Sequence, residues 1–253
     1  MRNTLTIAFR EIRSGFVTPL AYVVLASFMF LSGFFFFSLL QQFNSVLQQA
    51  MLIPDENPSL NAWVIVPYYQ TLEVVLIFLI PVLTMRSIAE EKRSGTFEML
   101  LTSPISVSQL IVGKFLGVAT IAIAMLVLSL AYPLILVAFS DPEVMPIFIG
   151  WFGVVLFALS FISIGVAVSA CTESQTVAGV VSIVTLLVFY ILDAPAEKLG
   201  GSLAGILKYL APTSHMELFV KGVLTGTDVV YFLSVCALGL FFANRVIDAE
   251  RWR

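Results

Sequence analysis

Residues 14–54 read SGFVTPLAYVVLASFMFLSGFFFFSLLQQFNSVLQQAMLIP, a stretch of 41 residues without one charged side chain. An α-helix needs about 20 consecutive apolar residues to cross the hydrocarbon layer of a membrane. Water-soluble domains carry about 25% charged residues, whereas this chain of 253 residues carries 11% and is 59% apolar. The stretch therefore predicts a membrane-spanning helix in an integral membrane protein.

The rest of the chain repeats this pattern. The predicted fold class is all-α, and residues 1–253 form one transmembrane domain. The first apolar run is much longer than the 7–15 residues of a cleaved signal peptide, so we expect it to remain as an anchor. Six spans are predicted, at Phe16–Leu40, Trp63–Met85, Leu110–Phe139, Ile147–Ala170, Val177–Leu192 and Val229–Ile247.

The distribution of basic residues predicts the orientation. With the amino terminus in the cytosol, ten of the thirteen Lys and Arg residues lie on the cytosolic side. Only Lys198, Lys208 and Lys221 lie outside. Lys and Arg concentrate on the cytosolic side of membrane proteins, so both termini are expected there.

Residues 1–15 predict an amphipathic helix at the membrane interface. Its aromatic side chains would enter the acyl boundary and its arginines would lie among lipid phosphates. An ordinary basic anchor for topology is an equally open interpretation. The membrane-interface residues are Arg2, Phe9, Arg10, Arg13 and Phe16.

The external segment 193–227 predicts two short apolar helices, one over Leu203–Leu210 and one over Met216–Leu224. Neither is long enough to span a bilayer. The pair is either a re-entrant or interfacial hairpin or a lid resting on the bundle. Capping boxes, in which Ser or Thr is followed three residues later by Glu or Gln, are predicted at Ser87–Glu90, Ser106–Gln109, Thr172–Gln175 and Ser214–Glu217.

The sequence offers little catalytic chemistry. His215 is the single histidine and is interpreted as a helix-start residue at a wet surface, while Cys171 and Cys236 are interpreted as small buried hydrophobes. No metal site is expected, because ligand-spacing motifs are missing. Gly113-Lys114 superficially resembles a phosphate-binding loop, but Ser and Phe stand where that loop requires its first Gly and its hydroxyl. Any ATP chemistry must therefore come from another polypeptide.

Two features lie within the predicted spans. Glu73 is a carboxylate inside the second span, where an ionisable group is costly and often marks a transport or proton pathway. The alternative is a carboxylate that reaches the outer interface. Gly113 and Gly117 form a Gly-x-x-x-Gly pair, which allows helix backbones to approach closely and is expected to serve packing within the bundle.

The cytosolic segment 86–109 carries the most specific pattern. Residues 85–104 read MRSIAEEKRSGTFEMLLTSP and are followed ten residues on by Gly113-Lys114. This segment resembles the signature of permease subunits of the type-2 ABC exporter family. The shared elements are an acidic-basic run, Gly-Thr, Glu, a Leu pair and Thr-x-Pro. The likeness is greatest to the branch of gliding-motility-associated permeases and their relatives in nitrous-oxide-reductase maturation.

This resemblance implies a complex in the bacterial inner membrane. Two permeases, identical or different, would pair in the lipid bilayer, each docked on a cytosolic ATPase that binds ATP and Mg²⁺. Residues 87–101 would be the coupling helix, and 171–175 a second, smaller contact. An external accessory protein is a further possible partner, and no nucleic acid is expected. The ATPase-coupling residues implied are Ser87, Glu90, Glu91, Lys92, Arg93, Gly95, Thr96, Glu98, Thr172 and Glu173.

Three functions are compatible with these observations. The first is an ATP-driven export permease without catalytic residues of its own. The second is a mechanotransmission subunit, which passes the motion of the ATPase to an external or membrane partner without moving a substrate. The third is an ion-coupled secondary transporter, which only Glu73 supports.

Overall fold

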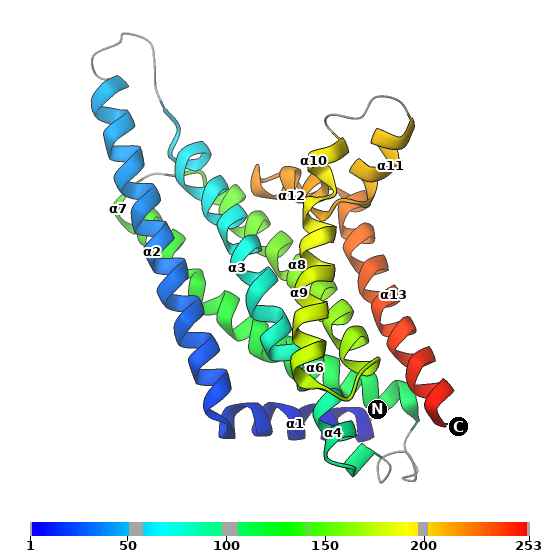
Figure 1. Ribbon diagram of the computed structural model, residues 1–253. Coiled ribbons are helices and arrows are strands. Elements are labelled where there is room, and N and C mark those ends of the chain that lie inside the picture. The colour runs from blue at the N-terminus through cyan, green and yellow to red at the C-terminus, as the bar shows by residue number, and fades with distance from the viewer. Residues whose placement is uncertain (1, 51–57, 98–105, 141, 197–201, 252–253) are drawn as a thin grey trace.

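The computed structural model shows an all-helical protein (Figure 1). It describes residues 2–50, 58–97, 106–140, 142–196 and 202–251, and no strand occurs within these ranges. The elements are α1 (Arg2–Val17), α2 (Pro19–Ala50), the π-helical turn η1 (Asn61–Ile65), α3 (Val66–Thr84), α4 (Ala89–Arg93), α6 (Val107–Ser129), α7 (Ala131–Phe139), α8 (Val144–Ala170), α9 (Gln175–Ile191), α10 (Asp193–Ala196), α11 (Ser202–Leu210), α12 (Pro212–Val220) and α13 (Gly226–Arg251).

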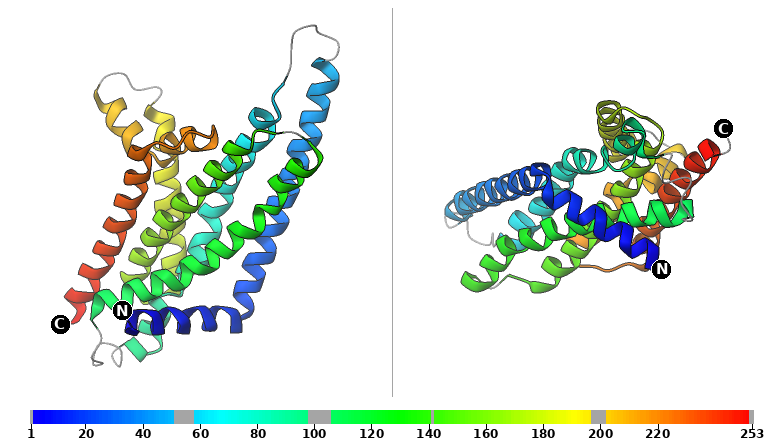
Figure 2. Two further views of the ribbon diagram at one scale, coloured as in Figure 1. Left: turned by 180° about the vertical axis from the view of Figure 1, so that it is seen from behind. Right: turned by 90° about the horizontal axis from the view of Figure 1, so that it is seen from below.

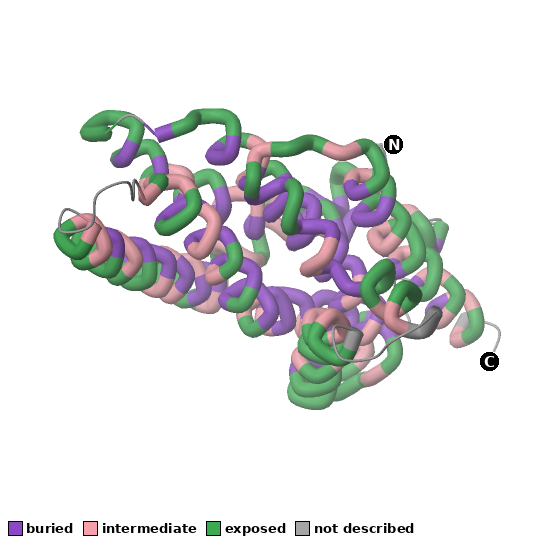
Figure 3. Tube along the Cα trace, turned by 90° about the horizontal axis from the view of Figure 1, so that it is seen from above, coloured by how far each residue is buried: buried purple, intermediate pink, exposed green. Residues whose placement is uncertain are grey.

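The six predicted spans are confirmed. Among the described residues, six helices are long and apolar enough to cross a membrane, at Pro19–Ala50, Asn61–Arg93, Val107–Phe139, Val144–Ala170, Gln175–Pro195 and Gly226–Glu250. In the second and fourth spans, 67% and 61% of the apolar 18-residue segment is buried within the chain, whereas in the fifth span only 22% is buried. Thus α3 and α8 form the core, and the outer helices are largely exposed (Figure 3). Many of their exposed side chains are apolar.

Helix α1 lies across the end of the bundle and runs crosswise to α2 (Figures 1 and 2). It packs on the predicted Gly-x-x-x-Gly face of α6. A Cβ at Gly113 would come within 2.8 Å of Ile7, and one at Gly117 within 2.5 Å of Glu11. The pair therefore serves packing within the chain, as predicted, and its partner is the amino-terminal helix.

The third span is interrupted between α6 and α7. Proline has no N–H and cannot bond the carbonyl four residues earlier, so Pro133 leaves the Ser129 carbonyl without its helical donor. The Tyr68 hydroxyl of α3 donates to that carbonyl over 3.1 Å. It also hydrogen-bonds the Ser32 hydroxyl of α2 at 2.7 Å. The break is thus stabilised by polar contacts from two neighbouring helices.

Of the four predicted capping boxes, only that of Ser106 and Gln109 is present. Helix α4 has no side-chain cap. Helix α9 is capped by Ser174, whose hydroxyl accepts from the Val177 N–H, and not by Thr172. At α12 the Ser214 hydroxyl donates to Asp193 instead of capping. These three predictions are wrong because tertiary partners or a neighbouring residue take the place of the predicted cap.

Two short helices do lie near the end of the bundle opposite α4 (Figure 1). Helix α11 agrees with the prediction, whereas α12 begins at Pro212, four residues earlier than predicted. Helix α12 packs on α8, since a Cβ at Gly153 would come within 2.7 Å of Phe219. Within the described residues, the α12 half of the hairpin therefore rests on the bundle.

Candidate coupling site

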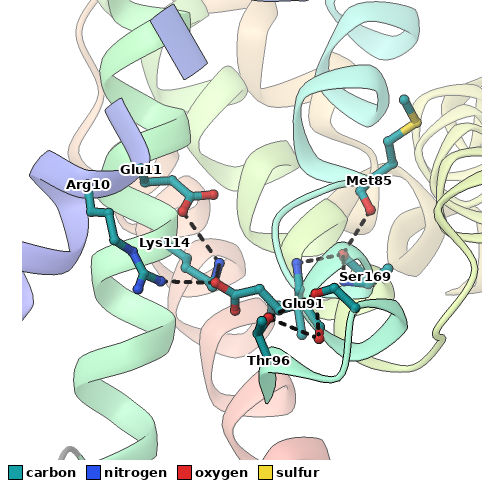
Figure 4. Close-up of polar contacts among 10 residues, drawn as sticks. Arg10, Glu11, Met85, Glu91, Thr96, Lys114 and Ser169 are labelled. Atoms are coloured by element: carbon teal, nitrogen blue, oxygen red, sulfur yellow. Dashed lines mark hydrogen bonds and ion pairs between the residues drawn. The ribbon is translucent and has the colours of Figure 1, made fainter. Parts of the chain in front are cut away.

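A single serine of α8 holds the start of α4. The Ser169 hydroxyl accepts hydrogen bonds from the backbone N–H groups of Ile88 and Ala89, each over 3.1 Å. It donates to the Met85 carbonyl at 3.3 Å (Figure 4). Free N–H groups at a helix start require such acceptors. Ser169 therefore supplies the cap that the sequence assigned to Ser87, whose hydroxyl is buried without a hydrogen-bond partner.

Lys92 ties α4 to two further helices. Its ammonium donates to the Ala170 carbonyl at the end of α8. It also pairs with Glu250 of α13 at 2.6 Å. The ring of Phe97 lies 5.4 Å from the same nitrogen. The Lys92 side chain is only 6% exposed, so it is a structural cation rather than a free surface charge.

Glu91 joins α4 to α1 and α6. Its Oε1 lies 3.0 Å from the Arg10 guanidinium and 3.0 Å from the Lys114 ammonium. Lys114 also pairs with Glu11 at 3.4 Å (Figure 4). Burial raises the pKa of the Glu11 carboxyl above its usual range, by more than the nearby Lys114 ammonium lowers it. The Lys114 side chain is 1% exposed, so the network holds a buried cation between two acidic side chains.

These contacts connect α4 with four helices. Ser169 and Lys92 hold it on α8 and α13, and Glu91 holds it on α1 and α6. A force applied to α4 therefore reaches these helices through short, direct bonds. We expect such a segment to transmit displacement, because it cannot move without breaking buried polar contacts.

Gly95 follows α4 in the left-handed conformation, with φ of 72°. Glycine adopts this region without the steric penalty that a Cβ brings. Nothing lies within 4 Å of a Cβ built at this position. Glycine is therefore favoured at position 95 by its backbone conformation and not by a close approach of another group.

The predicted coupling residues divide into two sets. Glu91 and Lys92 are occupied by partners in the same chain, and Thr172 is half-buried. Glu98 lies outside the described residues. The exposed members are Glu90, Arg93, Gly95, Thr96 and Glu173. Among the residues that the structure describes, neither Glu90 nor Arg93 has an ion-pair partner, so both are available to another molecule.

The predicted interface residues lie on α1, and their contact with the membrane stays a prediction. Phe9 is 72% exposed, Arg10 and Arg13 are exposed, and Phe16 is half-buried. The Arg2 side chain lies outside the described set. Arg10 faces Glu91 in addition to any lipid, which the sequence did not indicate.

Sequence alone did not indicate that Ser169, Glu11 or Glu250 belong to this site. Lys114 was noted as a cytosolic cation and in the Gly-Lys pair of the family signature, without a predicted partner. Their contacts join residues about 80 to 160 positions apart. A local pattern cannot show such contacts. The one available signal was an acidic residue within an otherwise basic amino-terminal helix.

The interpretation of His215 as a wet helix-start residue is wrong. Its side chain is buried, with Nδ1 at 2.7 Å from Asp228 and Nε2 at 2.9 Å from the Tyr209 carbonyl. The ring stacks on Tyr231, with centroids 3.9 Å apart. His215 therefore fastens α12 to α13. The interpretation of Cys171 as a buried hydrophobe is also wrong, since Cys171 is exposed.

Glu73 is buried within the bundle. Its side chain is 2% exposed and lies against protein. A role in a pathway stays a prediction. In the described ranges, no group of three His, Cys, Asp or Glu residues is arranged to hold a metal ion.

The helical bundle, with its six long apolar helices, defines a multi-pass membrane protein. Residues 56–243 match the family model of the ABC-2 family transporter proteins. Because the match covers most of the chain, the protein belongs to that family.

Two curated relatives carry the same description, a probable multidrug ABC transporter permease YbhR, from Escherichia coli strains K12 and O157:H7. Each is 23% identical over 182 residues, which cover 71% of this chain and 44% of the relative. The chain thus spans less than half the length of the curated relatives it matches.

Proposed function

We propose that this chain is the permease subunit of an ABC exporter that is driven by ATP hydrolysis in a separate cytosolic ATPase. The ATPase binds ATP and Mg²⁺, and α4 with its turn docks on it. The observation that carries the proposal is that one side of α4 contacts the rest of the chain and the other side is exposed. Glu91 and Lys92 face the chain's own helices, while Glu90, Arg93 and Thr96 are exposed at the end of the bundle.

The placement of the termini supports a cytosolic position for this surface. Both termini lie at the same end as α1 and α4 (Figures 1 and 2). That end also carries most of the basic residues, which favour the cytosolic side. A bacterial inner membrane with both termini in the cytosol is the arrangement that we propose.

A second copy of the chain, or a related permease, completes the transporter in this proposal. Only 22–28% of the apolar segments of the spans formed by α2, α9 and α13 is buried within one chain. These helices therefore retain apolar faces for lipid and for a partner. Within the family, the order of residues in 85–104 favours the gliding-motility and nitrous-oxide-maturation branch. The description of the curated relative as a multidrug permease favours a small-molecule cargo.

A mechanotransmission subunit is the second candidate. One observation favours it: α8 contacts α4 through Ser169 and α12 through Gly153. A single rigid helix therefore links the proposed ATPase contact to the external hairpin. In this case the hairpin would act on an external accessory protein, and reconstituted vesicles would show ATP hydrolysis without uptake of any candidate cargo.

The coupling proposal is tested with the ATPase encoded beside this gene. We expect co-purification and stimulated hydrolysis with the unaltered chain. Arg93→Glu should weaken the complex by about tenfold or more, since reversing a charge at an interface costs more than about 1.4 kcal/mol.

The matched control is Glu143→Arg, because Glu143 is exposed and precedes α8 at the opposite end. Unchanged affinity and stimulation in Arg93→Glu, or an equal loss in Glu143→Arg, would contradict docking through α4.

A further inference from the structure

A cavity of about 280 Å³ lies at the end of the bundle that carries the external hairpin. Its walls come from α3, α9, α10 and α12. The residues of α3 are Gln70 and Glu73, and those of α9 and α10 are Tyr190 and Asp193. The cavity is separate from the coupling site around α4.

Glu73 lines this cavity without a partner. Its side chain is 2% exposed, and its Oε1 is buried and accepts no hydrogen bond from any described residue. Removing an isolated carboxylate from water is costly unless a cation or hydrogen-bond donors compensate. The unfilled acceptor therefore points to a positively charged or donating group that occupies the cavity.

The other carboxylates of the cavity are already engaged. Asp193 accepts a hydrogen bond from the Ser214 hydroxyl at 3.0 Å. Glu217 pairs at 2.6 Å with Lys221, a residue that does not line the cavity. No Lys, Arg or His is among the residues that line the cavity in the described chain. The cavity thus has an excess of negative charge, and Glu73 is its uncompensated member.

The remaining walls select the kind of cation. Met216 and Val220 supply apolar surface, and Tyr190 supplies an aromatic ring. Aromatic rings attract organic ammonium groups. A divalent metal ion would require several oxygen ligands, and no group of three His, Cys, Asp or Glu side chains suited to a metal occurs among the described residues.

We propose that this cavity binds a small monovalent organic cation with a substituted ammonium group. The Glu73 carboxylate would neutralise the charge, and Met216 and Val220 would contact the alkyl groups. The volume lies just below the range of drug-sized ligand sites, about 300–1,000 Å³, which limits the ligand to a compact molecule. Only the identification of this ligand as cargo rests on the proposed function, since binding itself needs no ATPase.

Radiolabelled tetraethylammonium is the probe. Equilibrium binding is measured on the full-length chain in lipid nanodiscs, without the ATPase, so that failure of binding and failure of coupling are separate results. We expect saturable binding to the unaltered chain and at least tenfold weaker binding to Glu73→Gln. Excess unlabelled tetraethylammonium should displace the probe, whereas sodium chloride at equal ionic strength should not.

Two variants complete the test. Glu143→Gln is the matched control, because it removes an exposed carboxylate outside the cavity, and its affinity should stay within about twofold of the unaltered chain. Thr213→Trp should abolish binding by filling the cavity while Glu73 remains. Thermal unfolding of each variant checks that it is folded. Equal binding by Glu73→Gln, displacement by sodium, or no saturable binding would overturn the proposal.

Discussion

Ser169 is the residue on which the position of α4 depends most directly. One hydroxyl accepts from two backbone N–H groups and donates to a carbonyl across the α3–α4 connection. Ser169→Ala would leave buried donors unpaired, and each unsatisfied buried group costs about 1–3 kcal/mol. We expect a lower midpoint of thermal unfolding and a loss of at least half of the ATPase stimulation.

Ser160→Ala is the matched control on the same helix. Its hydroxyl is equally buried but donates only to the Phe157 carbonyl of its own helix, so its removal leaves no backbone donor without a partner. We expect a change of about 1 kcal/mol or less in the free energy of unfolding. If the two alanine variants behaved alike, Ser169 would not be a specific attachment point for α4.

At the scale of single residues, the sequence predicted where polar residues lie better than it predicted which residues they contact. A polar, charged segment was correctly expected between the second and third spans. The pairing of Glu91 with Lys114, however, joins two segments 23 residues apart, and Ser169 caps a helix from 80 residues away. Capping boxes describe local bonds only, so they failed wherever a distant side chain offered a better acceptor.

Among the short elements, the α4 turn depends on the conformation of one glycine. Gly95 has positive φ and open space around it, so the cost of a side chain there is conformational. Alanine in the left-handed region costs about 1–2 kcal/mol. We expect Gly95→Ala to reduce affinity for the ATPase about tenfold, and Gly95→Asn to be milder because asparagine tolerates this region better.

Gly205 provides a control for this element. It also has no neighbour within 4 Å of an added Cβ, but it lies in α11 with ordinary helical geometry. Alanine is favoured over glycine in a helix by about 0.5–1 kcal/mol. Gly205→Ala should therefore be neutral or stabilising in thermal unfolding. Equal effects at the two glycines would show that the positive φ of Gly95 has no mechanical importance.

Long elements were predictable from sequence because their length and apolarity are set by the membrane itself. Short elements were less so. The start of α12 was predicted too late because the prediction relied on a local Ser–Glu pattern. In the structure the helix begins at Pro212, and His215 is buried. The sequence shows that the third span contains Pro133, but the Tyr68 bond that stabilises the break there comes from another helix.

On the scale of the whole molecule, the bundle has two chemically different ends. One carries α1, α4 and both termini, and the other carries helices α11 and α12 (Figure 1). The basic residues predicted this division, because their asymmetry acts over the entire chain. The sequence could not predict that α8 contacts both α4 and α12, since that follows from three-dimensional packing.

The orientation of the two ends can be tested with cysteine labelling. Cys171 is exposed in the turn after α8, at the α4 end, while Cys236 lies within the last span and is replaced by serine. Partial burial raises the pKa of the Cys171 thiol, so labelling is done near pH 8.5, where a larger fraction is the reactive thiolate. A membrane-impermeant maleimide should label Cys171 in inside-out vesicles and at least tenfold less in intact cells.

The opposite end supplies the complementary measurement. Leu224 is 56% exposed in the connection between α12 and α13. In a chain where serine replaces both native cysteines, Leu224→Cys should react in intact cells and be protected in inside-out vesicles. Reaction of both positions from the same side would contradict a bundle with separate faces. Reaction of Cys171 from outside would place α4 beyond the reach of a cytosolic ATPase, because Ser169 and Lys92 hold α4 beside Cys171 at the end of α8.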